Sequence, residues 1–358
     1  MLQEFHQSLG ARFAELNGAP VVNDYGDVPA ELGALRQSVG VLDFSFRSRL
    51  CLVGADRARF LHGQVTNDVK KLRVGEGCYA AITTAKGKME SDLNVFCLAD
   101  ELLLDFEPGL AEKISQRLEK YIVADDVQIV DAAPHYGLLS VQGPKAEATV
   151  RALGLFAEIP VHPLASIKVS DPALGEIYLA NNPRLMNSGF DLFVPNDSLA
   201  AVADKLTAAA KQNGGRACGW QAFETARIEA GIPRFGADMD ETNIPLECGL
   251  EARAITYTKG CYIGQEVINR IHSVGHVNRE LRGLRLAADL KSLPQRGDKL
   301  FHAGKEAGYL TSAIKSPSLK ANIALGYVSR EANQPGTELT LRTADGETPA
   351  KIVALPFV

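Results

Sequence analysis

The most reactive group in the sequence is a cysteine set between two glycines. Residues 259–266 read KGCYIGQE, which places Cys261 between Gly260 and Gly264, with Lys259 two residues upstream. Glycine leaves a neighbouring sulfur unshielded, and a nearby ammonium group favours the nucleophilic thiolate over the thiol. The pattern therefore predicts a functional thiol at Cys261, assisted by Lys259. The plainer alternative is that Cys261 is a small buried side chain in a turn.

Two elements are expected to position this cysteine. Residues 254–258, AITYT, predict an extended β segment, whereas Val267, Ile268 and Ile271 follow at helical spacing. Cys261 is then expected at a strand-to-helix turn, where the amides that begin a helix further stabilise a thiolate.

A second candidate is Arg227, on a helix expected over residues 218–230. A planar guanidinium can hold a carboxylate or a polar ring edge in a fork that lysine cannot reproduce. The ordinary alternative is a surface ion pair with Glu224, which lies three residues earlier and would contribute a few tenths of a kcal/mol.

No metal site is predicted. The six cysteines are far apart and form no CxxC pair, and His272 and His276 are separated by Gly275 without a carboxylate pattern to complete a site. A self-contained zinc or iron-sulfur site is therefore not expected. A long chain without a secretion signal is expected to keep its thiols reduced.

Composition excludes several classes of function. The 358 residues are 46% hydrophobic, enough for more than one hydrophobic core, and the formal net charge of -5 argues against binding to nucleic acid. No apolar run is long enough to span a membrane, and residues 1–6 lack the zones of a signal peptide. We expect a cytoplasmic protein with two or three subdomains.

The order of elements predicts an α+β fold, because strands and helices are mixed without regular βαβ alternation. Extended segments between about residues 77 and 106 indicate an antiparallel meander. Short apolar runs after residue 277, separated by Gly, Pro and Asp turns, predict a small C-terminal β-barrel. Helices are expected over about residues 3–16, 56–67, 143–154 and 197–211, and directly after residue 110.

Three stretches of the sequence resemble a known family. The segment KGCYIGQE resembles the signature of the YgfZ family, folate-binding relatives of the glycine-cleavage T protein that are linked to iron-sulfur cluster maintenance. Two further blocks are similar to stretches of the same group. The first is DFS at residues 43–45 with GADRARFLHGQVTND at 54–68, and the second is ETARIEAGIP at 224–233 followed by PLE at 245–247. The resemblance spans about residues 40–285.

This resemblance implies a fold, a ligand and a site. It implies a T-protein-like cloverleaf of three subdomains around a channel that holds tetrahydrofolate or a one-carbon derivative of it. Residues 1–276 would form the folate-binding region as two interleaved α+β subdomains, one centred on about residues 52–130, and residues 277–358 the barrel. Arg227 matches an arginine that lines the channel in T proteins, and the motif residues Tyr262, Gln265 and Glu266 are assigned to the same ligand.

Two positions depart from the T-protein pattern. T proteins carry Asp-Asp-Leu after the meander turn, where a carboxylate faces the reacting folate nitrogen, whereas this chain has Ser91 and Asp92 before Leu93. Asp92 is therefore the remaining candidate acid, because a serine is no acid or base at neutral pH. Asn187 stands where T proteins place a glutamate that grips the pterin, so it can hydrogen bond but cannot form a charge-assisted pair.

Three functions are consistent with these features. The leading hypothesis is a tetrahydrofolate-binding accessory protein for iron-sulfur cluster assembly or repair, which need not be catalytic. Cys261 would be its functional thiol, in transient contact with a cluster, and its partners would be iron-sulfur client or assembly proteins. The alternative is a folate-dependent aminomethyl or one-carbon transferase of the T-protein type. The third is an interaction module in which Cys261 only packs.

Overall fold

The computed structural model describes residues 2–358, and the chain forms two compact units. Unit 1 comprises Met1–Ile82, Ser91–Ala226 and Thr258–Tyr262. Unit 2 comprises Thr83–Glu90, Arg227–Tyr257 and Ile263–Val358. The motif KGCYIGQE is thus divided, with its first four residues in unit 1 and its last four in unit 2. The domain boundary expected after residue 276 stays a prediction.

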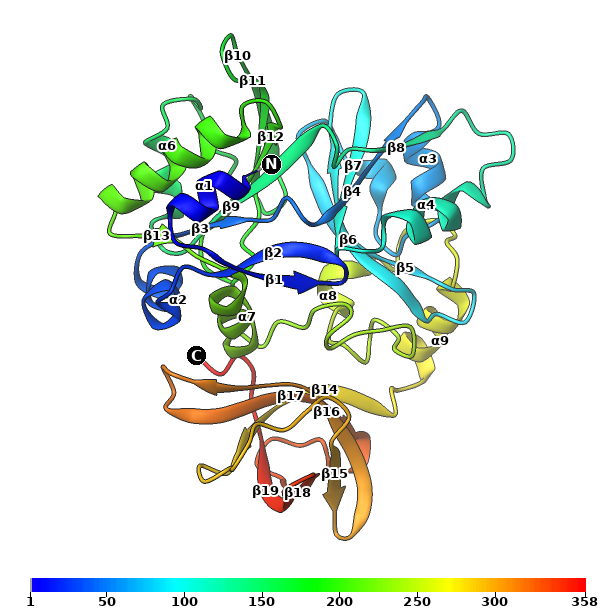
Figure 1. Ribbon diagram of the computed structural model, residues 1–358. Helices are drawn as coiled ribbons and strands as arrows, with labels where there is room; N and C mark the ends of the chain where they lie inside the picture. The colour runs from blue at the N-terminus through cyan, green and yellow to red at the C-terminus, as the bar shows by residue number, and fades with distance from the viewer. Residues whose placement is uncertain (1) are drawn as a thin grey trace. The chain divides into compact units, whose positions relative to one another are not determined.

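The first sheet of unit 1 has six strands, and all its pairs are antiparallel except β13 with β3. Helices α5 and α6 pack against it, and Figure 1 shows α6 beside its strands. In spatial order its strands are β10 (Ser166–Asp171), β11 (Gly175–Asn181), β12 (Gly189–Pro195), β9 (Tyr136–Gln142), β3 (Gly40–Asp43) and β13 (Arg216–Ala217). The helices are α5 (Ala146–Arg151) and α6 (Leu199–Gln212).

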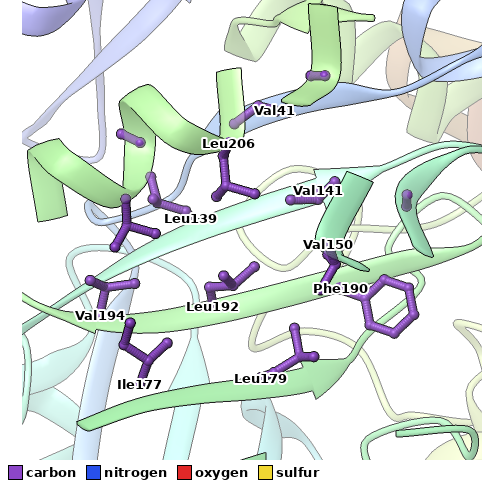
Figure 2. Packing of buried hydrophobic residues seen from close by; sticks show 14 of the residues in the cluster. Val41, Leu139, Val141, Val150, Ile177, Leu179, Phe190, Leu192, Val194 and Leu206 are labelled. Carbon is purple, nitrogen blue, oxygen red and sulfur yellow. The ribbon is translucent and has the colours of Figure 1, made fainter. Parts of the chain in front are cut away.

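The core of this sheet lies between its strands and these two helices. Figure 2 shows Leu139 and Leu192 of the strands in one cluster with Leu206 of α6 and Val150 of α5. Apolar residues recur along α6 every three or four positions, so one face of that helix is buried. The helix expected over residues 197–211 is therefore confirmed.

The second sheet of unit 1 has five strands, and its first three form the expected meander. Helices α3 and α4 pack on it over a separate apolar cluster. Its strands, in spatial order, are β5 (Gly77–Thr83), β6 (Met89–Cys97), β7 (Glu101–Phe106), β4 (Ser48–Val53) and β8 (Gln128–Asp131). The helices are α3 (Arg57–His62), η1 (Val69–Lys71) and α4 (Ala111–Glu119). The remaining elements that begin in unit 1 are α1 (Gln3–Ser8), the hairpin of β1 (Arg12–Leu16) and β2 (Ala19–Asp24), α2 (Val28–Gln37) and α7 (Trp220–Glu229).

Unit 2 contains a closed six-stranded barrel, so the prediction of a C-terminal β-barrel is confirmed. Alternate side chains of its strands fill an apolar interior. The barrel elements are β14 (Arg279–Leu286), β15 (Lys299–His302), β16 (Lys305–Ser316), β17 (Ala321–Ser329), η2 (Arg330–Ala332), β18 (Glu338–Thr343) and β19 (Gly346–Val353). The unit also holds α8 (Glu251–Ala254) and α9 (Gln265–Val274).

Three local predictions are wrong. The helix expected over residues 3–16 ends at Ser8, because Gly10 takes a φ of 79° and β1 follows. The helix expected over 56–67 ends at His62, after which Val65 pairs with Ile82. The β segment expected over 254–258 is absent from the described chain, where α8 covers its first residue. Among residues 2–358, no helix is both long and apolar enough to cross a membrane.

Candidate functional site

The loop that carries Cys261 is fastened to unit 1 by a buried lysine. Lys259 is 7% exposed, and its Nζ donates hydrogen bonds to the carbonyl oxygens of His62, Val65 and Asn67 at 2.6, 2.5 and 2.8 Å. Burial lowers the pKa of Lys259 to about 8, an effect opposed by the nearby Asp68. The three carbonyl dipoles also favour the charged form. The lysine therefore clamps the loop to residues 62–67.

Cys261 itself is exposed, so it is not a buried side chain that fills a turn. All three ammonium protons of Lys259 are engaged by backbone carbonyls. The structure thus shows Lys259 as a positioning residue, and the expected activation of the thiol by its ammonium has no contact to support it. The turn before α9 is also not preceded by a strand, contrary to expectation.

Three further side chains accompany this loop, and two of them escaped the sequence analysis. His62 Nδ1 lies 3.2 Å from Asp68 Oδ1, and both residues belong to the quoted block at residues 54–68. The ring of Tyr262 lies 4.8 Å from Lys259 Nζ. Within residues 2–358 its buried hydroxyl has no hydrogen-bond partner, and burial raises its pKa to about 12. A histidine, a carboxylate and a buried phenol therefore accompany the loop that carries the thiol.

The second half of the motif belongs to unit 2, where Gly264 begins α9 with a φ of 90°. A Cβ on Gly264 would lie 2.5 Å from Thr84 O and 2.7 Å from Thr83 Oγ1, so only glycine fits this contact. Gln265 is half-buried and Glu266 is exposed in the first turn of the helix. The ligand role assigned to these two residues stays a prediction.

A buried network of charges joins the two sheets of unit 1. Arg184 Nη2 donates to Asp105 Oδ2 of β7 at 2.8 Å and to Asp191 Oδ2 of β12 at 2.6 Å. Arg47 donates to Asp105 Oδ1 at 2.7 Å and to Glu107 at 2.6 Å. Burial alone would raise the pKa of Asp105, but the two guanidinium groups hold it well below its ordinary value. We call these five residues the arginine network.

Asp92 lies at the edge of this network. It is half-buried on β6, and Tyr79 donates a hydrogen bond from its hydroxyl to Asp92 Oδ2 at 2.7 Å. Burial and then the charge of Glu107 raise the pKa of Asp92 above its ordinary value, which makes it a suitable proton donor and acceptor. Ser91 is fully buried and, by strand alternation, points to the opposite face with Leu93. The acid that this chain retains is therefore the one on the polar face.

Aromatic side chains continue the same assembly. Arg184 lies over the ring of Phe44, with its Cζ 5.3 Å from the ring centroid. Phe46 contacts Phe44 at 5.7 Å and Trp220 at 5.6 Å between ring centroids, and both Phe46 and Trp220 are partly exposed. Partly exposed aromatic rings and a carboxylate with acceptor capacity suit a heteroaromatic ring with amine groups on its edge, such as a pterin.

Arg227 has a different environment from the one expected. It is 2% exposed, and its guanidinium donates to Asp238, to Ile232 O at 3.1 Å and to Ser312 Oγ at 3.1 Å, all within unit 2. The alternative of a surface ion pair is therefore wrong. Arg227 is a structural ion-pair residue, and its contact with a ligand stays a prediction.

Asn187 is not brought to the arginine network by any contact. It is exposed and lines a shallow cavity of about 370 Å³ in unit 1, together with Met186, Glu147 and Arg151. A second cavity of about 340 Å³ is lined by Cys97, Tyr178 and other residues that the sequence analysis did not single out. The predicted role of Asn187 at a pterin thus gains no structural support.

The cysteines and acids do not assemble into a metal site. Within the described residues none of the six cysteines forms a disulfide, and Cys51, Cys218 and Cys248 are buried. No group of three or more His, Cys, Asp or Glu side chains that could hold a metal ion occurs among residues 2–358.

Comparison with known proteins shows similarity along the whole chain. Residues 2–259 match the GCVT N-terminal domain, and residues 279–358 match the glycine cleavage T-protein C-terminal barrel domain. An aminomethyltransferase of Cupriavidus necator is 30% identical over 100% of this chain and 96% of its own length. An aminomethyltransferase of Halalkalibacterium halodurans is 27% identical over 99% and 96%.

A solved structure has the same fold. The glycine cleavage system aminomethyltransferase T from Bartonella henselae superposes with a TM-score of 0.89 at 23% identity, over 100% of this chain and 97% of that one. The predicted α+β, T-protein-like fold with a C-terminal barrel is confirmed by this match.

Proposed function

This chain belongs to the glycine cleavage T-protein family, and we propose that it binds tetrahydrofolate and transfers a one-carbon unit to or from it. Relatives named aminomethyltransferases match it over nearly their full length, which supports this function over the accessory role that the motif KGCYIGQE first suggested. The family match alone does not define an activity, so the proposal depends on the residues of the site.

The observation that carries the proposal is Asp92. Its carboxyl lies on the polar face of β6, is held by Tyr79, and has a raised pKa. The raised pKa brings this carboxyl closer to the range in which a group both holds and releases a proton, which favours general acid–base catalysis. Asp92 is the catalytic residue of the proposal.

The ligand would be held by the same assembly. Tetrahydrofolate supplies, when bound, the nitrogen atoms that carry the one-carbon unit. Phe46 and Trp220 offer partly exposed aromatic edges and faces to its ring, and the carboxylate of Asp92 accepts hydrogen bonds from an amine edge. The arginine network forms its own ion pairs, and one of its members, Glu107, lies close enough to Asp92 to raise the pKa of that carboxyl.

The proposal is tested by the production of methylene-tetrahydrofolate from tetrahydrofolate and an aminomethyl donor. We expect product with the wild-type protein and a loss of about 100-fold or more with Asp92→Asn, which keeps the acceptor for Tyr79 but cannot exchange the proton. Equal rates for the two proteins would remove Asp92 from the chemistry. If neither protein forms product, the transferase function is wrong.

A second function is favoured by one observation, the exposed Cys261 on a loop that Lys259 holds in place. The similarity of KGCYIGQE to the YgfZ family supports a folate-binding accessory role in iron-sulfur cluster assembly or repair, with client or assembly proteins as partners. Cys261 would then act as a thiol together with a partner rather than as a resident ligand of a cluster.

This second function predicts a phenotype that the transferase does not. A strain that lacks the gene should lose activity of its iron-sulfur enzymes under oxidative stress, and the wild-type gene should restore it. Cys261→Ala should fail to restore that activity while it forms methylene-tetrahydrofolate normally. Full restoration by Cys261→Ala would exclude the thiol from the accessory role.

A further inference from the structure

We propose that Cys261, His62 and Asp68 form a thiol–imidazole–carboxylate site, in which His62 Nε2 takes the proton of the thiol and Asp68 stabilises the imidazolium. This inference concerns a different part of unit 1 from the proposed folate site and does not depend on it. The arrangement is that of an activated nucleophile, with a base beside it and a third group beside the base.

Gly260 is the first observation. A Cβ on this residue would lie 3.3 Å from His62 Nε2, and apart from its two chain neighbours the described residues place only Nε2 and Cδ2 of that ring within 4 Å of it. The φ of Gly260 is not positive, so the backbone conformation does not require glycine there. The missing side chain instead leaves room for the imidazole directly beside the residue that precedes Cys261.

The proposal requires that a rotation of the Cys261 side chain bring its thiol to this nitrogen. The Cα atom of Cys261 lies about 3.8 Å from that of Gly260, the residue beside which the imidazole packs. Cys261 is exposed and makes no hydrogen bond in the rotamer of the structure, among residues 2–358. An exposed side chain exchanges rotamers within nanoseconds, which is fast compared with covalent chemistry.

His62 is prepared to accept a proton. The charged groups that face it are Asp68, Lys259, Lys70 and Lys71. Burial, then Lys259, and more weakly Lys70 and Lys71 lower the pKa of His62, while Asp68 raises it. The imidazole is therefore neutral at neutral pH, the form that acts as a base.

Asp68 lies on the other side of the ring. Its Oδ1 is 3.2 Å from His62 Nδ1, although the two atoms are not aligned for a hydrogen bond. Such contacts are often long before reaction and tighten when the imidazole gains a proton. Asp68 is also paired with Lys71 at 3.1 Å, so its carboxylate stays ionised. The position of Asp68 beside Nδ1 and the ionised state of its carboxylate both favour an imidazolium on His62 once the thiol has released its proton.

The loop is held rigidly enough to keep these groups together. Lys259 Nζ binds the carbonyl of His62 at 2.6 Å, which joins the cysteine loop to the residue that carries the base.

The chemistry balances with a carbon electrophile such as iodoacetamide. The thiol proton moves to His62 Nε2, the thiolate sulfur forms a bond to the methylene carbon, and the carbon–iodine bond breaks to release iodide. The imidazolium then loses its proton to water. No oxidant or reductant is needed.

The test is the rate of iodoacetamide alkylation of Cys261 in the full chain, followed by peptide mass spectrometry between about pH 5 and about pH 9. We expect His62→Gln to lower the rate at neutral pH by about 10-fold or more and to shift the profile to that of an unassisted thiol. Asp68→Asn, which leaves the ring in place, should lower the rate by less. Lys70→Gln should leave it nearly unchanged.

Two outcomes would overturn the site. The first is a pH–rate profile of folded His62→Gln that coincides with that of the wild type. The second is a pair of results, in which the pH–rate profiles of Asp68→Asn and of Gly260→Ala both equal that of the wild type. The methyl group added in Gly260→Ala should press on the imidazole of His62. Fluorescence of the single tryptophan, Trp220, confirms folding of each variant before its rate is measured.

Discussion

Replacing Lys259 by methionine tests the clamp that holds the cysteine loop. The substitution keeps a long apolar side chain in a nearly closed site and removes the ammonium group. The carbonyl oxygens of His62, Val65 and Asn67 then lose their common donor, and each is left without that partner. We expect unit 1 to be destabilised and the loop to be released.

The magnitude follows from two opposing effects. Hydrogen bonds to a charged group contribute about 1.5–3 kcal/mol each, so three of them contribute about 5–9 kcal/mol. Burial lowers the pKa of Lys259 from 10.5 to about 8, which corresponds to about 3 kcal/mol against the charged form. Methionine carries no charge, so the variant avoids this cost of burying the ammonium group. The net loss is about 2–6 kcal/mol, a large part of the stability of an ordinary domain.

Urea unfolding measured by the fluorescence of Trp220 is the appropriate assay, because this single tryptophan packs against Phe44 and Phe46 in unit 1. The control is Lys205→Met on α6, where the lysine is exposed and methionine has a similar helix propensity. A midpoint for Lys259→Met equal to that of the control, at an unchanged slope, would refute the clamp.

Three further predictions concern stability. Asp105→Asn should destabilise unit 1 by about 3–5 kcal/mol at neutral pH, because it removes one of the two carboxylates that each buried guanidinium group contacts. Because the pKa of Asp105 is lowered in the folded state, its carboxylate stabilises unit 1 above about pH 4, and this stabilisation declines in acid. A difference between the urea midpoints of variant and wild type that stays constant as the pH falls would contradict this. Asp92 has the opposite shift, so Asp92→Asn should raise the urea midpoint at neutral pH, with a gain that disappears below about pH 4. Gly264→Ala should destabilise unit 2 by about 2 kcal/mol more than Gly304→Ala in thermal unfolding, because both residues have positive φ but only Gly264 meets the backbone of Thr84.

Regular periodicity made part of the fold predictable. Apolar residues at helical spacing indicated α6, and alternating apolar residues between turn residues indicated the barrel of unit 2. Prediction failed where a contact with the preceding turn overrides the β preference of a short segment. Residues 254–258 look like a strand, but Tyr257 bonds Glu251 within the turn after α8, and no partner strand is available in the described chain.

The candidate site was predictable in its residue types but not in their partners. Lys259 stands two residues from Cys261, and this spacing suggests activation of the thiol, whereas its hydrogen-bond acceptors lie 192 to 197 residues away in the sequence. The ligand contact expected of Arg227 stays a prediction, and the sequence did not reveal its ion pair with Asp238, eleven residues later. His62 was missed because its position beside Gly260 depends on the same long-range docking.

The most direct test of the proposed function is anaerobic calorimetry of tetrahydrofolate with the wild-type protein. We predict saturable binding to a single site in the micromolar range, about −8 kcal/mol. The control ligand p-aminobenzoylglutamate, which lacks the pterin ring, should bind far more weakly. No saturable heat with tetrahydrofolate, from a protein whose folding is confirmed by Trp220 fluorescence, would contradict a folate-dependent function for this chain.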